Sequence, residues 1–286
     1  MRATIFLTLC LGSTIGLSAC DHSMDPAEVE RAVGVNVIDE SNLNDVMLNA
    51  GDPNEAVNYF QSALLQSPDR IDLQRGLAKS LVRAKKSEQA ARVWADVVAN
   101  DEATSDDKIA YADALIRAGE WDKADEVLKT IPPTVESFDR YRLEAMVADS
   151  NKDWKRADSF YETAVGLTTR PAHTLNNWGY SKLTRGDYRG AEKLFQEALS
   201  YDSTMFTAKN NLVMARGAQR QYDLPVMSMT QRERAQLYYT LGLTAVKQGD
   251  LTMGRTLLEQ AVQTHPQHFD QAAQALKALE ANVSQG

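Results

Sequence analysis

The residue types that carry out catalysis are present in this sequence, but they do not form a recognisable catalytic set. The segment Gly249–Thr256 resembles a phosphate-binding loop, yet Arg255 stands where that motif requires Lys, and the motif needs a preceding strand. His265 and His268 flank Pro266 with no third metal ligand nearby. No nucleophile, base and orienting partner stand at the spacing of a known active site. The sequence therefore predicts a binding protein with no catalytic residue, no metal site and no cofactor.

The net charge of the chain indicates which kinds of partner it can bind. The chain has 31 Lys and Arg against 39 Asp and Glu, which gives a formal net charge of -8. Nucleic-acid binding depends on a net basic surface that neutralises phosphates. We therefore expect protein partners, with no nucleic acid and no small-molecule substrate.

The first residues have the pattern of a secretory signal. Arg2 precedes an apolar run that ends at Leu17, and a helix of that length reaches only about 22 Å, too short for a bilayer core of about 30 Å. The exit sequence Leu17-Ser18-Ala19-Cys20 resembles the bacterial lipobox. That resemblance implies a signal peptide over residues 1–19 and lipidation of Cys20. The alternative is an ordinary signal peptide that is cut after Ala19 and leaves Cys20 as a free thiol.

Lipidation would account for both cysteines of the chain. Cys10 would leave with the signal, and the thiol of Cys20 would carry lipid, so that no disulfide, thiolate metal site or Cys nucleophile remains. Multiple acyl chains anchor a protein durably to a membrane. We expect residues 20–36, which carry no repeat signal, to be the lipidated Cys and a tether.

A period of about 34 residues runs through the rest of the chain. Small residues recur at Ala56, Ala90, Ala124, Ala157 and Ala191, and a large apolar residue follows four positions later at Phe60, Trp94, Leu128, Tyr161 and Phe195. This pattern resembles the tetratricopeptide repeat, in which the small residues allow two helices to cross closely and the large ones fill the space between units. The resemblance implies an all-α, right-handed solenoid of helix-turn-helix units.

The period also sets the expected domain boundaries. We place the solenoid at 37–283, with units near 37–70, 71–104, 105–137, 138–171, 172–205, 206–229 and 235–268. The unit at 206–229 is degenerate, because the sequence around Pro225 indicates an extended strap in place of a second helix. An amphipathic helix at 269–283 is typical of the cap that covers the last repeat.

The first helix of each unit is expected to line the concave face, and two sets of residues there are candidates for partner binding. Arg75, Lys79 and Arg83 form a basic stripe, while Asn42, Asn176, Asn177, Asn210 and Asn211 stand at matching positions of several units. An asparagine amide both donates and accepts hydrogen bonds, which suits an extended peptide backbone. The stripe suits an acidic segment. The alternative interpretation is a solvated charge stripe and asparagines repeated only by descent.

The C-terminal part is similar to the TadD-type lipoproteins of tight-adherence (Flp) pilus systems. The similarity rests on Asn210–Ala215, the strap that contains Pro225, Ala235–Leu237, Val246–Asp250 and His265–Asp270. It implies a scaffold for pilus assembly that faces the periplasm of a Gram-negative envelope and helps the secretin to localise or multimerise. We expect the outer membrane, although Asp21 leaves the inner membrane open. The alternatives are a general envelope adaptor, either pilotin-like or a recruiter of hydrolases, and an enzyme hidden in the array.

Overall fold

The computed structural model describes residues 37–283, and within this range the chain forms α-helices and the turns between them. The helices are α2 (Val37–Asn49), α3 (Pro53–Gln66), α4 (Ile71–Arg83), α5 (Ser87–Val98), α6 (Ser105–Arg117), α7 (Trp121–Lys129), α8 (Phe138–Ser150), α9 (Trp154–Gly166), α10 (Ala172–Thr184), α11 (Tyr188–Tyr201), α12 (Phe206–Ala218), α13 (Gln231–Lys247), α14 (Leu251–Thr264) and α15 (Asp270–Val283). The all-helical class expected from the sequence is confirmed.

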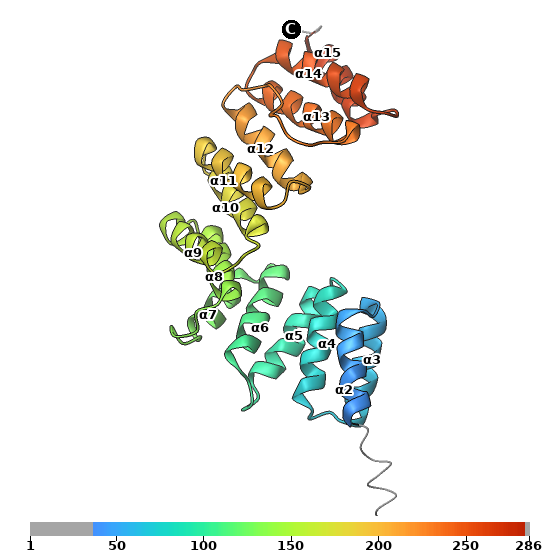
Figure 1. The fold of residues 1–286 in the computed structure, drawn as a ribbon, viewed down its shortest axis with the longest axis vertical. Helices are drawn as coiled ribbons and strands as arrows, with labels where there is room; N and C mark the ends of the chain where they lie inside the picture. The colour runs from blue at the N-terminus through green and yellow to red at the C-terminus, as the bar shows by residue number, and fades with distance from the viewer. Residues whose placement is uncertain (1–36, 284–286) are drawn as a thin grey trace, which may run out of the picture. The chain divides into compact units, whose positions relative to one another are not determined.

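The chain divides into two compact units. The first is Met1–Gly51, of which the structure describes α2 and the turn after it. The second is Asp52–Gly286 and contains α3 to α15. In the second unit each helix packs against the next one along the chain, as Figure 1 shows. This sequential packing is the arrangement of a helical solenoid.

Tight turns join the two helices of a pair, and their backbone is left-handed at one position. Gly119 and Gly186 have φ angles of 82° and 86° there, which glycine adopts without steric cost. Lys85 and Lys152 hold the same position in other pairs with φ of 59°. The position after the turn is an acidic helix cap in several pairs, as with Asp187, whose carboxylate accepts from the backbone N–H of Gly190.

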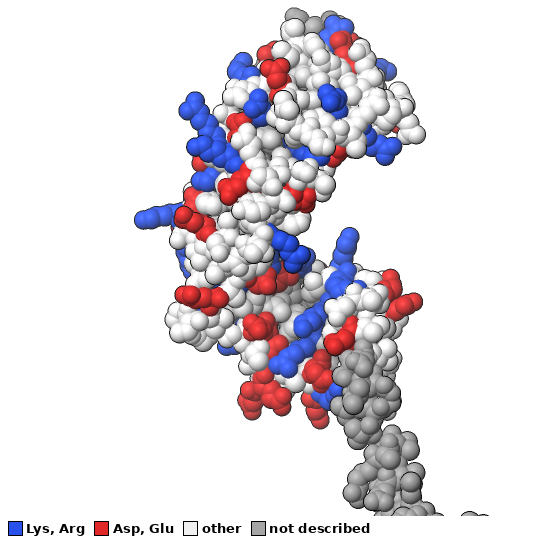
Figure 2. Space-filling view, viewed as in Figure 1, with Lys and Arg blue, Asp and Glu red and all other residues white. Residues whose placement is uncertain are grey.

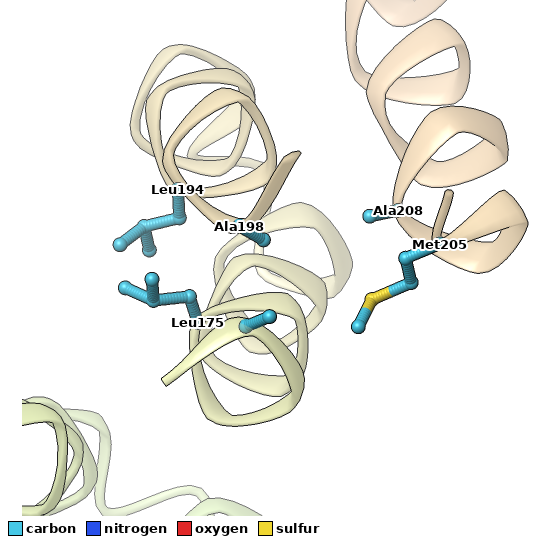
Figure 3. Close-up of a cluster of buried hydrophobic side chains, with 6 residues drawn as sticks. Leu175, Leu194, Ala198, Met205 and Ala208 are labelled. Carbon is cyan, nitrogen blue, oxygen red and sulfur yellow. The ribbon is translucent and has the colours of Figure 1, made fainter. Parts of the chain in front are cut away.

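The core follows the small–large alternation that the sequence predicts. Ala90 and Ala191 are completely buried, and so are the rings of Trp94 and Phe195 four residues after them. The small residues allow close approach of the paired helices, and the large ones occupy the space that this leaves. Figure 3 shows one such cluster, in which Leu175 of α10 and Leu194 of α11 lie next to each other, while Met205 and Ala208 at the start of α12 lie on the side of Ala198.

The regular pairing is interrupted after α12. No helix forms over residues 221–230, and this segment, the strap, leads directly to α13. Tyr222, Leu224, Met227 and Met229 of the strap pack against a core cluster that includes Val213, Leu237, Leu241, Ala245 and Leu257. A capping box between Thr230 and Glu233 then starts α13. The unit that begins with α12 therefore has one helix, with an extended strap covering the place of the second.

The last helix covers the end of the solenoid. Phe269 and Ala272, at the beginning of α15, are buried against Ala235 of α13 and Ala261 of α14. A salt bridge of 3.1 Å from Arg255 to Glu280 also ties α14 to α15. Among the residues that the structure describes, no helix combines the length and apolarity needed to cross a membrane.

Candidate partner-binding site

The first helices of successive pairs form one side of the second unit, and a pocket opens there. It has a volume of about 510 Å³. The lining side chains come from α8, α10 and α12, with further residues from α7 and α9: Trp121, Met146, Asp149, Ser150, Trp154, Tyr161, Asn176, Asn177, Tyr180, Thr184, Thr207 and Asn211. Three of the predicted asparagines are among them. The pocket spans two junctions between repeat units.

Side-chain hydrogen bonds join the first helices across these junctions. Asn211 on α12 donates its Nδ2 to Oδ1 of Asn176 on α10 at 3.0 Å, and both residues are buried. One unit further, Thr240 on α13 donates to Oδ1 of Asn210 at 2.7 Å. In both bonds the acceptor lies in the preceding repeat unit, one residue before the position that is equivalent to the donor. Asn176, Asn210 and Asn211 therefore hold neighbouring units in register, a role that uses part of their hydrogen-bonding capacity.

Asn177 and Tyr180 differ from these three residues. Within residues 37–283, neither the Asn177 amide nor the Tyr180 hydroxyl makes a hydrogen bond to another group of the chain. Asn177 is half-buried on the pocket wall, and Tyr180 is 51% exposed at its edge. A half-buried amide with both donors and its acceptor unused is suited to pairing with a peptide backbone.

Aromatic side chains and one acidic group complete the pocket. Trp121 and Trp154 are the first residues of α7 and α9, and both are half-buried. Burial raises the pKa of Asp149, and it raises the pKa of the neighbouring Tyr161 hydroxyl well above its usual range. Tyr161 therefore stays protonated and can donate a hydrogen bond at neutral pH. The pocket combines apolar walls with a few polar groups, as peptide-binding and ligand-binding sites do.

The predicted basic stripe lies on α4, away from this pocket. Arg75 binds Asp107 of α6 through two hydrogen bonds of 2.8 and 2.7 Å, and its Nη2 also donates to the Glu102 carbonyl at 3.1 Å. Arg75 thus joins two units as a charge-assisted clamp. Lys79 is exposed, whereas Arg83 is half-buried. Figure 2 shows a row of basic side chains in the region of α4 to α6, with acidic side chains interspersed around it.

Two other residues that the sequence singled out, Asn42 and Cys20, have side chains outside the described part of the chain. Asn42 lies in α2 of the first unit, and its side chain is outside the described part of the chain. Cys20, with the signal and tether of residues 1–36, is outside the described residues as well. Among the side chains that are described, no cluster of three or more His, Cys, Asp and Glu is placed to hold a metal ion.

Several lining residues were missed by sequence reasoning, although some carry a signal. Met146 stands at the repeat position of Tyr180, 34 residues before it, and Ser150 and Thr184 are likewise 34 residues apart. Trp121 and Trp154 are both first residues of a second helix. Extending the asparagine register to these positions would have identified them. Asp149 has no such signal, because Leu183 holds the equivalent position in the next unit.

Comparison with known proteins agrees with the repeat. Two tetratricopeptide-repeat family models match the sequence, one at residues 47–106 and the other at residues 235–268. No curated protein matches the chain significantly. Together with the helix pairs and the core pattern, these matches show tetratricopeptide repeats in two stretches of the chain and the fold of a tetratricopeptide helical solenoid.

Solved structures with similar folds have little sequence in common with this chain. A chain of the APC/C hetero-tetramer Cut9-Hcn1 aligns over 88% of this chain and 51% of its own length, with 15% identity and a TM-score of 0.60. This chain thus spans about half the length of that relative. A tetratricopeptide-repeat protein from Parabacteroides merdae aligns over 84% of this chain and 96% of its own, with 13% identity and a TM-score of 0.56.

A third structure, MamA from residue 41 onward from Desulfovibrio magneticus RS-1, covers 58% of this chain and 94% of its own. Its identity is 15% and its TM-score is 0.50. At such low identities the similarity establishes the fold. The tetratricopeptide fold itself indicates a scaffold for protein–protein interaction.

Proposed function

We propose that this protein is a lipid-anchored, periplasm-facing scaffold for pilus assembly, and that the pocket between α8 and α12 binds an extended segment of a partner protein. Partners are expected among the proteins of a tight-adherence pilus and its secretin. The lipid on Cys20 fixes the location, and the solenoid presents the binding surface. The expected membrane is the outer one.

The observation that carries the binding proposal is the position of Asn177. Its amide lines a pocket of about 510 Å³ and has no hydrogen-bond partner within residues 37–283. An extended peptide offers unpaired backbone N–H and C=O groups, which an asparagine side chain can satisfy in pairs. Trp121, Trp154 and Tyr180 provide the apolar and aromatic area on which the side chains of such a peptide can pack.

The anchoring and the pilus assignment rest on sequence. The Leu17-Ser18-Ala19-Cys20 match supports lipidation, and the similarity of the C-terminal segments to TadD-type lipoproteins supports the pilus apparatus. A surface of net negative charge gives no electrostatic attraction to anionic lipid, so a lipid anchor is the more effective means of holding this chain on a membrane.

Site-specific crosslinking in living cells tests the proposal. A photoreactive benzoylphenylalanine replaces Tyr180, which is 51% exposed at the pocket, or Tyr201, which is 56% exposed and lines no described pocket. The proposal predicts an adduct from position 180, absent from position 201, whose partner belongs to the pilus or secretin apparatus. Replacing Asn177 by Ala should weaken that adduct.

The outcomes separate the parts of the proposal. Equal adducts at both positions, or none at position 180, would refute the binding pocket. An adduct at position 180 with an unrelated envelope protein would keep the pocket and refute the pilus role. Membrane fractionation of a Cys20→Ser variant tests the anchor, because release of the protein into the soluble fraction is the expected result.

A further inference from the structure

The partner-binding pocket carries one formal charge. Of the residues that line it, only Asp149 is acidic, and neither Lys nor Arg is among them. The rest of the wall is aromatic, apolar or neutral polar. A carboxylate on an otherwise neutral pocket sets up an attraction for a positive group, because it is not cancelled by a charge on the same wall.

The hydrogen bonding of Asp149 leaves room for such a group. Its Oδ1 accepts a short hydrogen bond from the hydroxyl of Ser181, a buried residue on α10. No donor within residues 37–283 contacts the second carboxylate oxygen. An ionised carboxylate can accept about four hydrogen bonds, so most of its capacity is unused.

Arg185, whose charge acts on Asp149, and Arg142, which lies on the same helix as Asp149, are both paired with other carboxylates. The Arg185 guanidinium donates to Asp158 at 2.5 Å. The Arg142 guanidinium donates to Asp113 at 3.2 Å. Burial raises the pKa of Asp149 and outweighs the lowering by the Ser181 hydroxyl and the Arg185 charge. A carboxylate whose negative charge is balanced by neighbouring donors and positive charges would have a lowered pKa instead.

The apolar walls suit the long stem of a basic side chain. Lys and Arg bury their methylene groups along apolar surface while the charged end reaches a polar partner, and cations also favour the faces of aromatic rings. The pocket already has an example on its border, where the Arg185 guanidinium lies 5.6 Å from the Trp154 ring centre. Trp121, Met146 and Tyr180 supply further surface of this kind.

We infer that the pocket selects an extended segment with a Lys or Arg side chain, whose charged group pairs with Asp149 while the segment's backbone pairs with Asn177. This inference rests on the proposed function and specifies the partner. It also separates the pocket from the α4 stripe, whose basic residues would attract a segment of the opposite charge.

A phage-displayed library of random twelve-residue peptides, selected on the full-length protein in detergent, tests the inference. Enriched peptides should contain Lys or Arg next to apolar residues. Replacing that basic residue by Gln should weaken binding about ten- to a hundredfold, as expected for the loss of a charge-assisted hydrogen bond. Asp149→Asn should weaken binding of the original peptide by a similar factor, because Asn keeps an acceptor for Ser181 but removes the charge.

Asp96→Asn is the matched control, because Asp96 is exposed on α5 and lines no described pocket. Its affinity should equal that of the unmodified protein, and circular dichroism should show the same helix content in all variants. Enriched peptides that bind through Asn177 but carry no basic residue, with affinity unchanged in Asp149→Asn, would overturn the inference and keep the proposed function. Failure to enrich any peptide whose binding depends on Asn177 would contradict both.

Discussion

Replacing Gly76 by Ala brings a methyl group into steric overlap with the aromatic ring of Phe60. A Cβ atom built on Gly76 lies 2.4 Å from Cε1 of that ring and 2.7 Å from Cδ1 and Cζ. Non-bonded carbon atoms normally lie about 3.5–4.0 Å apart. The ring or the helix must therefore move by about 1 Å to accommodate one additional methyl group.

The expected change in the free energy of unfolding follows from two opposing effects. Phe60 is 1% exposed and packs between α3 and α4, so it has little space into which to move. Forcing an extra group into such a core costs about 1–3 kcal/mol, and the tight contact places Gly76 toward the upper end of this range. Ala is favoured over Gly in a helix by about 1 kcal/mol. We expect a net loss of about 2 kcal/mol in the free energy of unfolding.

Urea denaturation measures this loss, followed by far-UV circular dichroism and by tryptophan fluorescence, to which the buried Trp94 on α5 contributes with the three other tryptophans. Gly166→Ala is the control, because a Cβ at Gly166 meets nothing within 4 Å. The control should be unchanged or slightly more stable. A Gly76→Ala variant as stable as the control would refute the close-crossing argument for the small residues of every unit.

Two further predictions concern the ionic and capping contacts. Burial opposes ionisation of Asp107, but Arg75 and Thr104 together lower the pKa of its carboxyl group in the folded state. The charged form therefore stabilises the folded protein above the ordinary Asp pKa of about 4. This stabilisation is lost as the pH falls through the lower pKa of the folded state. Between about pH 5 and pH 2, the unmodified protein should lose more stability than Asp107→Asn in urea titrations, and parallel curves would contradict the clamp. Thr230→Ala removes the side-chain half of the capping box with Glu233 and should lower the free energy of unfolding by about 1 kcal/mol, whereas no change in the urea midpoint would mean that the strap fixes the start of α13 without it.

The helix pairs are predictable from the sequence because one physical requirement repeats in every unit. A helix crossing needs a small residue such as Ala90 or Ala191, and the gap between units needs a large one such as Trp94 or Phe195. Because both requirements recur in every unit, small and large residues appear at a fixed spacing in the sequence. The interruption near Pro225 is predictable for the converse reason, since the pattern is lost where the backbone is restricted.

The pairing of individual side chains is not predictable in this way. The spacing of Arg75 shows which face of α4 it occupies, but not that Asp107, on a different helix, meets it. Likewise, the repeat register identifies Asn176 and Asn211 as members of one set, but their hydrogen bond depends on how far one unit is displaced along the next. These contacts depend on the distances between helices, and the repeat period of a sequence gives no information about those distances.

By the proposed function, Asn177 binds the backbone of a partner segment in the pocket between α8 and α12. The most direct measurement is the calorimetric affinity of the crosslinked partner segment, made as a synthetic peptide, for the unmodified protein, Asn177→Ala and the control Tyr201→Ala. Leaving two backbone groups of the peptide unpaired should cost about 1–3 kcal/mol, so we predict a Kd about five- to a hundredfold higher for Asn177→Ala and no change for Tyr201→Ala. An unchanged Kd for Asn177→Ala would contradict recognition of the peptide backbone by this residue.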